Sequence, residues 1–453
     1  MTTELQPMSR RSFIRAGTGT VLLGASGGLL AACGGGTGAG GSAGELTIMN
    51  RWNDPPSVAA VKAMIGRFEK TQPDIDIQSQ RRPSDGSTYQ PAVRSAFASS
   101  NPPDMATDIA GPEVFNLVKA GQLHDLTAFY NTSIKDHALA GATLGATLNG
   151  KVYGLSSSSQ IGNLVFSNPD YLSKYGVDAR SISTVDQWIA AMKAIKAKGG
   201  TPITLGAKDQ WPGGHYLNHL VQRTLGTEKA NQLYNRTVLA GQPDTPKWTD
   251  PAVVHAFELY VSMKPLFQKG FLGEGQDGAA SLFFTGKSGF YTMGSWFVSG
   301  IATNKPKFKP GVMLFPAVPG GGAPNEITLA NDVILVSKNA DWDATQKFLT
   351  YLYSPANLSV FGSAMLFYLP YRYKVQTAGV DPSVKDLFAQ IQGYMNTAGT
   401  KGASLFNDEI IDVNIYTKYI WQGSVGLMSG DLSPQKLASQ LEQATAQAQQ
   451  RNA

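Results

Sequence analysis

One cysteine, Cys33, occurs in 453 residues, and this limits how the chain can be stabilised. A lone thiol cannot form a disulfide within the chain, and a lipidated Cys33 could not ligate a metal. The fold must therefore be held together by packing. The folded part, about 410 residues, exceeds what one hydrophobic core usually covers, so we expect two domains.

Cys33 lies where an apolar stretch ends and a run of small residues begins. Arg10 and Arg11 precede the uncharged segment 16–32, an arrangement typical of a secretory signal peptide. The arginine pair resembles a twin-arginine export signal, and Leu30-Ala31-Ala32-Cys33 resembles the lipobox of bacterial lipoproteins. We therefore expect a signal peptide over 1–32, lipidation of Cys33 and a flexible tether over 33–44. The alternative is an ordinary signal with a chance cysteine.

The charge of the chain argues against nucleic acid as a partner. Removal of residues 1–32 leaves 35 basic and 32 acidic residues, a net charge of +3. Lys and Arg also form no cluster along the sequence, which a basic nucleic-acid-binding patch would require.

Strand and helix patterns alternate along the chain. A strand over 45–52 is followed by a helix capped by Ser57, strands over 73–78 and 104–110, and a helix from 112. A second unit begins near 151, with a strand over 163–168 and a helix capped by Thr184. Strands over 311–315 and 332–336 flank a glycine turn, 320–322, which reads as a hairpin connection. The patterns predict two doubly wound α/β units whose chain crosses more than once.

Several segments, in this order, resemble the extracellular solute-binding proteins of ABC importers. The closest group is the carbohydrate-binding one, which includes maltose- and multiple-sugar-binding proteins. The lipobox and tether come first, and the resemblance then covers the whole mature chain. The further segments that carry it are "ELTIMNRW" with "RFEKTQPDIDIQ", "SSNPPDMATDIAGPEVFNLVKAGQLHDLT", "LNGKVYGLSSSSQIGNLVFSNPDYLSKYG", "LFFTGKSGFYTMGSW" and "FPAVPGGGAPNEITLANDVILVSKNA".

The resemblance implies two α/β lobes joined by a hinge of several strands, with a ligand cleft between them. Residues 45–158 plus 304–340 are then expected in lobe one, and 159–303 plus 341–453 in lobe two. The function implied is that of a monomeric, non-enzymatic binding lipoprotein, anchored to the outer face of the bacterial cell membrane. It would capture a sugar or oligosaccharide and deliver it to a membrane permease, without a cofactor or metal.

A sugar site needs flat aromatic rings against the C–H faces and polar side chains for the hydroxyl groups. We looked for both at strand ends, where open α/β sheets bind ligands, and in the segments that resemble the family's ligand contacts. The candidates are Trp52, Asn53, Asp54, Asp108, Ser159, Gln160, Trp211, Trp296, Asn331, Asp332 and Tyr368. Phe406-Asn407-Asp408 is a weaker one. Core packing, helix capping and turn chemistry are the competing explanations for these residues.

Two other motifs are rejected. Gly286-Lys287-Ser288 ends like a phosphate-binding loop, but residue 281 is serine where that motif needs glycine. His215 and His219 have the spacing of zinc ligands, but Tyr216 stands where a zinc protease has glutamate. We expect both histidines on a helix surface.

Two rival functions stay open. An exported glycoside hydrolase would need two carboxylates flanking one bond, and the sequence cannot place carboxylates in space. A binding protein of the same fold for a polyol or glycerol phosphate would need arginine in its cleft, and Arg51, Arg81, Arg82 and Arg372 could supply it.

Overall fold

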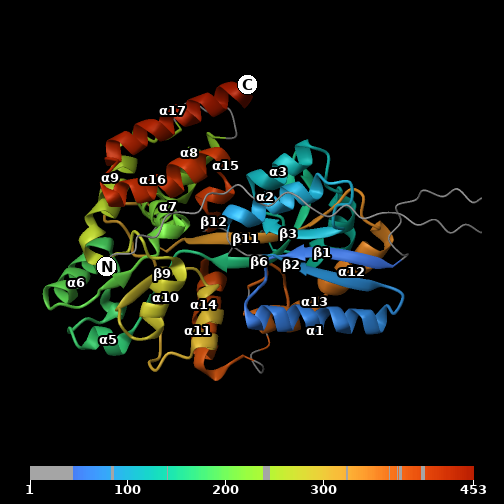
Figure 1. Cartoon of the computed structure of the whole chain (residues 1–453), viewed down its shortest axis with the longest axis horizontal. Helices are drawn as coiled ribbons and strands as arrows, with labels where there is room; N and C mark the ends of the chain where they lie inside the picture. Colours follow the sequence, from blue (N-terminus) through green and yellow to red (C-terminus); the bar gives the residue numbers. More distant parts are fainter. Residues whose placement is uncertain are drawn as a thin grey trace, which may run out of the picture. The chain divides into compact units, whose positions relative to one another are not determined.

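The computed structural model describes residues 44–82, 86–139, 141–237, 245–322, 325–366, 368–374, 376, 380–398 and 403–452. Cys33, Arg10, Arg11 and almost all of the predicted tether lie outside the described residues. Figure 1 shows the arrangement of the helices and strands.

The first sheet begins with three parallel strands near the start of the described chain. Its strand order is β12-β11-β3-β1-β2, and β6 pairs with the other edge of β11. The pairs β1–β2, β1–β3 and β11–β12 are parallel, whereas β11 runs antiparallel to β3 and β6. The strands are β1 (Glu45–Asn50), β2 (Asp76–Arg81), β3 (Met105–Ile109), β6 (Gly154–Ile161), β11 (Ile327–Val336) and β12 (Ala403–Leu405).

Helices cover both faces of the first sheet. Buried side chains of α1 and α13 share one core with β1, and buried side chains of α2 and α3 share another with β3 (Figure 1). The helices are α1 (Pro55–Thr71), α2 (Gly86–Phe97), α3 (Pro112–Lys119), α4 (Thr127–Phe129), α12 (Trp342–Leu352) and α13 (Pro355–Met365). Between α4 and β6 in the sequence, β4 (Thr147–Leu148) and β5 (Lys151–Val152) form a short antiparallel hairpin.

Helix α1 begins earlier than the sequence pattern predicts. Its N-cap is Asp54, whose carboxylate accepts a hydrogen bond of 3.1 Å from the Ser57 amide. Ser57 is buried within the first turn, so its predicted capping role is wrong. The Asp-Pro-Pro sequence explains the difference, because proline is favoured in the first helical turn and aspartate before it. By contrast, Thr184 does cap α6, and Gln187 completes a capping box.

The second sheet has the order β10-β7-β9-β8. Only the β8–β9 pair is parallel. Its strands are β7 (Leu164–Ser167), β8 (Ile203–Thr204), β9 (Phe290–Met293) and β10 (Gly311–Leu314). The remaining helices are α5 (Pro169–Ser173), α6 (Val185–Ala197), α7 (Trp211–Leu225), α8 (Thr227–Asn235), α9 (Pro251–Ser262), α10 (Gln276–Phe284), α11 (Phe297–Asn304), α14 (Pro382–Ala398), α15 (Val413–Ile415), α16 (Gln422–Ser429) and α17 (Pro434–Asn452).

Two segments belong to a different sheet from the one that the predicted lobe boundaries imply. Strand β10 pairs with β7 in the second sheet, although 304–340 was assigned to lobe one. Helices α12 and α13 pack into the core of the first sheet, although 341–453 was assigned to lobe two. The glycine turn 320–322 therefore does not close a hairpin. It lies on a connection from the second sheet back to the first, because β11 pairs with β3 and β6.

The chain passes between the sheets at Asn163, which follows β6 and precedes β7. The side-chain amide of Asn163 donates to the Glu326 main-chain carbonyl over 2.9 Å and accepts from the Thr328 main-chain amide over 2.9 Å. Its main-chain carbonyl accepts from the Phe315 amide at 2.8 Å. Asn163 is buried, so these bonds tie the outgoing segment to the returning one.

Candidate functional site

Four aromatic side chains gather where the second sheet meets β12. Trp211 and His215 lie one turn apart on α7, with ring centroids 4.8 Å apart. Trp296 follows β9 and lies 6.4 Å from Trp211 and 6.2 Å from His215. Phe406 follows β12 and stacks on His215 at 3.9 Å. Trp211, His215 and Trp296 are partly exposed, so this aromatic cluster offers ring surface to a ligand.

Glycines let two of these rings lie close to the backbone. A Cβ on Gly162, in the segment that joins β6 to β7, would overlap the Phe406 ring. A Cβ on Gly294 would overlap the Trp296 ring, which folds back over it. The Gly-x-Trp motif thus fixes the position of the tryptophan by close approach of its ring to a residue without a side chain.

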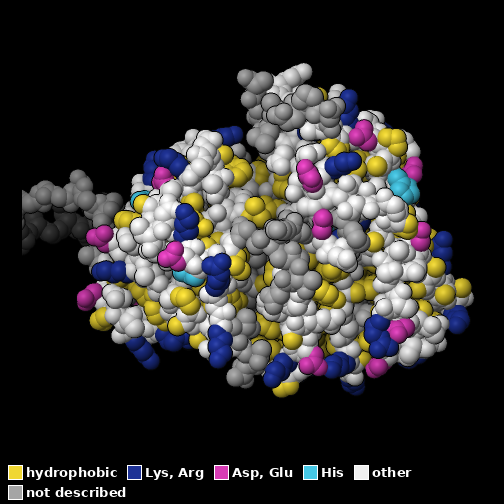
Figure 2. All heavy atoms as spheres, turned by 180° about the vertical axis from the view of Figure 1, so that it is seen from behind, with side chains coloured by type: hydrophobic (Ala, Val, Ile, Leu, Met, Phe, Trp, Pro, Cys, Tyr) yellow, Lys and Arg dark blue, Asp and Glu magenta, His cyan; other side chains and the backbone are white. Residues whose placement is uncertain are grey.

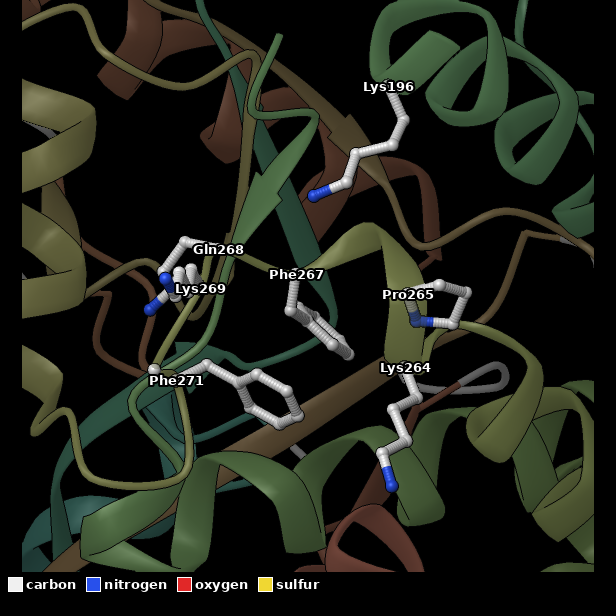
Figure 3. A pocket seen from close by; sticks show the side chains of 8 residues that line it. Lys196, Lys264, Pro265, Phe267, Gln268, Lys269 and Phe271 are labelled. Atoms are coloured by element: carbon white, nitrogen blue, oxygen red, sulfur yellow. The ribbon is translucent and has the colours of Figure 1, made fainter. Parts of the chain in front are cut away.

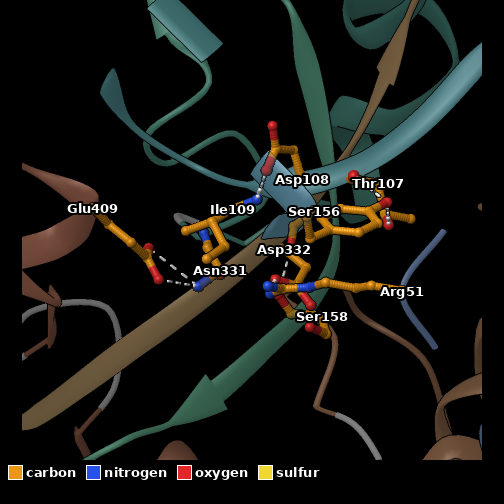
Figure 4. A network of polar contacts seen from close by, with 10 residues as sticks. Arg51, Thr107, Asp108, Ile109, Ser156, Ser158, Asn331, Asp332 and Glu409 are labelled. Atoms are coloured by element: carbon orange, nitrogen blue, oxygen red, sulfur yellow. Dashed lines mark hydrogen bonds and ion pairs between the residues drawn. The ribbon is translucent and has the colours of Figure 1, made fainter. Parts of the chain in front are cut away.

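Charged side chains lie where β1 and β3 end beside the middle of β11 (Figure 4). Arg51, just after β1, forms an ion pair with Asp332 on β11. Asp108 on β3 is buried, and its carboxylate accepts from the Ile109 amide over 2.8 Å. Tyr89 lies beneath them and donates to the Thr107 carbonyl over 2.9 Å. A guanidinium and two carboxylates therefore lie together at the carboxyl ends of β1 and β3, which we call the charged edge.

The 3-10 turn after Phe406 connects this charged edge to the aromatic cluster. Glu409 is buried and accepts from the Asn331 main-chain amide at 3.0 and 3.2 Å. Its neighbour Asp408 lies 3.4 Å from the imidazole of His215. This turn thus places Asp408 beside the aromatic cluster and Glu409 against β11.

Burial changes the ionisation of these carboxyl groups. It raises the pKa of Asp108 to about 7, against the opposing effects of the Ile109 hydrogen bond and Arg51. Burial also raises the pKa of Glu409 well above its usual range, and the charge of Asp408 adds to the effect. Burial lowers the pKa of Arg51, but Asp332 and Asp108 raise it more. Such shifts occur where carboxylates crowd together away from water.

The structure brings together five of the predicted residues: Trp211, Trp296, Asp108, Asn331 and Asp332. Ser159 and Gln160 lie next to them on β6. The Ser159 hydroxyl donates to the Asn331 side chain, and Gln160 accepts from the Ser295 hydroxyl. Both residues are buried, so in this structure they hold Asn331 and Ser295 in place and do not face solvent.

Trp52, Asn53, Asp54 and Tyr368 have structural contacts instead. Trp52 is 4% exposed and packs edge-on against Phe361 in the core. The Asn53 amide donates to the carbonyls of Arg51 and Arg82, and Asp54 caps α1.

Tyr368 is 2% exposed, stacks on Phe388 and donates to that residue's carbonyl over 2.9 Å. Here core packing and capping account for the side chains.

His215 and Glu409 were not predicted as site residues. His215 was expected on a helix surface, but it is half-buried between Phe406 and Trp211, and His219 is fully buried. One sequence signal could have revealed His215: it stands four residues after Trp211, hence on the same face of the helix. Glu409 carries no such signal, because only the tertiary fold places it against β11.

A hollow of about 410 Å³ lies elsewhere, against α6 and the segment after α9 (Figure 3). It contains none of the predicted site residues, and its charged groups are lysines rather than carboxylates. Its lining residues are Lys196, Lys264, Pro265, Phe267, Gln268, Lys269, Gly270 and Phe271. We place the candidate site at the aromatic cluster, where the predicted residues converge.

The described residues contain no group of three His, Cys, Asp or Glu side chains arranged to hold a metal ion. Within the same residues, every helix is too short or too polar to cross a bilayer. On the face shown in Figure 2, Lys and Arg are interspersed with Asp and Glu and form no continuous basic patch.

Comparison with known proteins gives one family. The family described as "Bacterial extracellular solute-binding protein" matches residues 52–358. An uncharacterised ABC transporter extracellular-binding protein of Pyrococcus horikoshii is 24% identical over 309 residues, which are 68% of this chain and 67% of that protein. The multiple sugar-binding protein of Streptococcus mutans is 24% identical over 314 residues, 65% of this chain and 68% of that protein.

Solved structures share the fold. A chitin oligosaccharide binding protein superposes with a TM-score of 0.78 at 22% identity, over 90% of this chain and all of that one. A protein from a study of xylan utilisation by Caldanaerobius polysaccharolyticus gives a TM-score of 0.76 at 24% identity, over 88% and 99% of the two chains. The likeness confirms the predicted fold class.

Proposed function

The chain belongs to the bacterial extracellular solute-binding proteins, the binding components of ABC transporters, and on this premise we propose that its solute is a sugar or oligosaccharide. The observation that carries the proposal is the aromatic cluster beside the carboxylates of β3, β11 and the turn after β12. Rings of Trp211 and Trp296 can cover the C–H face of a pyranose, while Asp332 and Asp408 accept from its hydroxyl groups.

An anionic ligand, such as glycerol phosphate, is less well matched. Arg51 lies at the candidate site, and Asp332 already binds it. Arg81 and Arg82 are exposed on or after β2, and exposed Arg372 donates to the Asp136 carbonyl over 3.0 Å. An incoming phosphate would therefore have to compete with a carboxylate already in place.

We assign the two sheets and their helices to two lobes that close on the ligand about the Asn163 crossing. The side-chain bonds of Asn163 to Glu326 and Thr328 join the outgoing and returning segments and would lie at this hinge. Solution scattering with and without saturating sugar tests closure. A smaller radius of gyration is expected on binding, and an unchanged radius would contradict a clamping cleft.

The relatives' description as extracellular fits the expected export of this chain. We propose that the Arg10-Arg11 signal directs export and that lipidated Cys33 holds the protein at the outer face of the cell membrane. The segment 33–44 would then leave the folded part free to meet its permease as a monomer. No cofactor enters this function.

A ligand screen by thermal shift on the folded protein tests the sugar proposal directly. Mono- and oligosaccharides of different linkage are compared with polyols and glycerol phosphate. A ligand that binds only the folded form raises the melting temperature. A rise with sugars is expected, and a rise with glycerol phosphate alone would refute the proposal. A parallel assay for new reducing ends should stay negative, and hydrolysis would favour the glycosidase alternative.

A further inference from the structure

The charges around the candidate site are unbalanced. Five carboxyl groups lie in this region: Asp332 and Asp408 are partly exposed, and Asp108, Glu113 and Glu409 are buried. Two guanidinium groups pair with them, since Arg51 binds Asp332 and Arg94 binds Glu113 at 2.9 Å. Among the described residues, no Lys or Arg forms an ion pair with Asp108, Asp408 or Glu409. Because burial raises the pKa of Glu409 well above its usual range and that of Asp108 to about 7, the uncompensated negative charge near neutral pH lies mainly on Asp408.

Part of this group can be reached from solvent. The side chain of Asp332 is 16% exposed, and that of Asp408 is 11% exposed, whereas Asp108 and Glu409 are almost fully buried. Among the described residues, the ion-pair partner of Asp408 is the imidazole of His215 at 3.4 Å, and a histidine is a cation only when protonated. Asp408 is thus the exposed carboxylate with the least compensation.

A second, independent observation concerns Ser158. It is 1% exposed, and its hydroxyl has no hydrogen-bond partner. Ser158 is the register partner of Asp332 on the neighbouring strand β6, so both side chains lie on the same face of the sheet (Figure 4). A buried hydroxyl seldom stays unpaired in a native protein, so its position next to Asp332 indicates a partner supplied from outside the chain.

We propose that the ligand is a sugar bearing a protonated amino group, of the glucosamine class, and that Asp408 receives that group while Asp332 and Ser158 bind hydroxyl groups of the same sugar. The inference rests on the sugar-binding function proposed above and narrows its substrate class. An ammonium group would restore the charge balance of this surface. The indole rings of Trp211 and Trp296 would favour it further, because ring faces attract cations.

Isothermal titration calorimetry with a matched sugar pair tests the proposal. The β-1,4-linked glucosamine disaccharide and cellobiose share ring and linkage and differ at the 2-position, where one carries an ammonium and the other a hydroxyl. The amino disaccharide should bind the full chain at least about tenfold more tightly at low ionic strength. Asp408→Asn should reduce the ratio of the two affinities to about threefold or less. Asp170→Asn removes an exposed carboxylate on α5 and should leave the ratio unchanged.

The outcomes separate this inference from the function on which it rests. Equal affinities, or tighter binding of cellobiose, would overturn the charge argument and leave sugar binding intact. An Asp408→Asn ratio equal to that of the unaltered chain would also overturn it. If no sugar in the wider panel binds, the sugar-binding proposal fails and this inference fails with it.

Discussion

Trp296 offers the sharpest test of the proposed binding surface. Its ring lies over Gly294, within 6.4 Å of Trp211 and Phe406, and is partly exposed. Tryptophans at the centre of binding sites commonly cost about 2 kcal/mol or more of binding free energy when cut to alanine. At 1.4 kcal/mol per factor of ten, Trp296→Ala should weaken sugar binding about 30-fold or more.

The stability of the unliganded protein separates this role from core packing. A buried tryptophan costs about 3–5 kcal/mol of folding free energy when replaced by alanine. Trp296 is only partly buried, so Trp296→Ala should cost less folding free energy than this and lower the unliganded melting temperature only slightly. Calorimetric affinity and melting temperature are measured on the same preparation. A strongly destabilised variant with normal affinity would remove Trp296 from the site.

Two further variants make the test specific. Gly294→Ala places a methyl group where the Trp296 ring now lies, so it should displace the ring and weaken binding without deleting the indole. Trp342→Ala is the matched control, because Trp342 is also partly exposed and stacks at 4.2 Å, here on His124 beside the first sheet. It should cost stability and leave affinity unchanged, and a similar loss of affinity would contradict the proposed site.

Three other predictions concern pH dependence, the crossing between the sheets and the membrane anchor. Asp108→Asn should gain stability relative to the unaltered chain as the pH rises from about 4 to 7. The raised pKa of Asp108 in the folded state stabilises the native form at low pH, by at most about 4 kcal/mol. The unaltered chain loses this contribution as the pH rises through 7, whereas the asparagine variant does not titrate. Parallel melting curves against pH would contradict it. Asn163→Ala leaves the Glu326 carbonyl and the Thr328 amide without their partner and should cost about 1–3 kcal/mol in urea unfolding; no loss would mean that these bonds are dispensable. Cys33→Ser should release the protein from membranes without changing its melting temperature, and a variant that still sediments with membranes would refute lipid anchoring.

The sequence was sufficient for features that depend on local patterns. Sequence patterns and capping residues predicted α6 with its Thr184 cap, and strand β7 within 163–168. Such signals depend on neighbours in sequence, which a single chain displays directly. Element order also predicted an α/β fold. The two-lobed form followed from the resemblance of the ordered segments to the solute-binding family.

Assignments that depend on partners distant in sequence failed or stayed open. The local sequence of β10 does not determine whether it pairs with β7 or with β11. The sequences of α12 and α13 likewise do not determine that these helices pack on the first sheet. Trp52 and Tyr368 illustrate the same limit, since a tryptophan or tyrosine after a strand can face a cleft or a core.

Tertiary contacts also decided the chemistry of the site. Asp108 has an ordinary sequence setting, and its pKa rises only because the fold buries it beside other carboxylates. Glu409 lies about 80 residues from Asn331 in sequence, and only the pairing of β12 with β11 brings them together. Burial and charge are sums over the whole surroundings of a group, so the sequence supplied the residue types while the fold determined what each one could do.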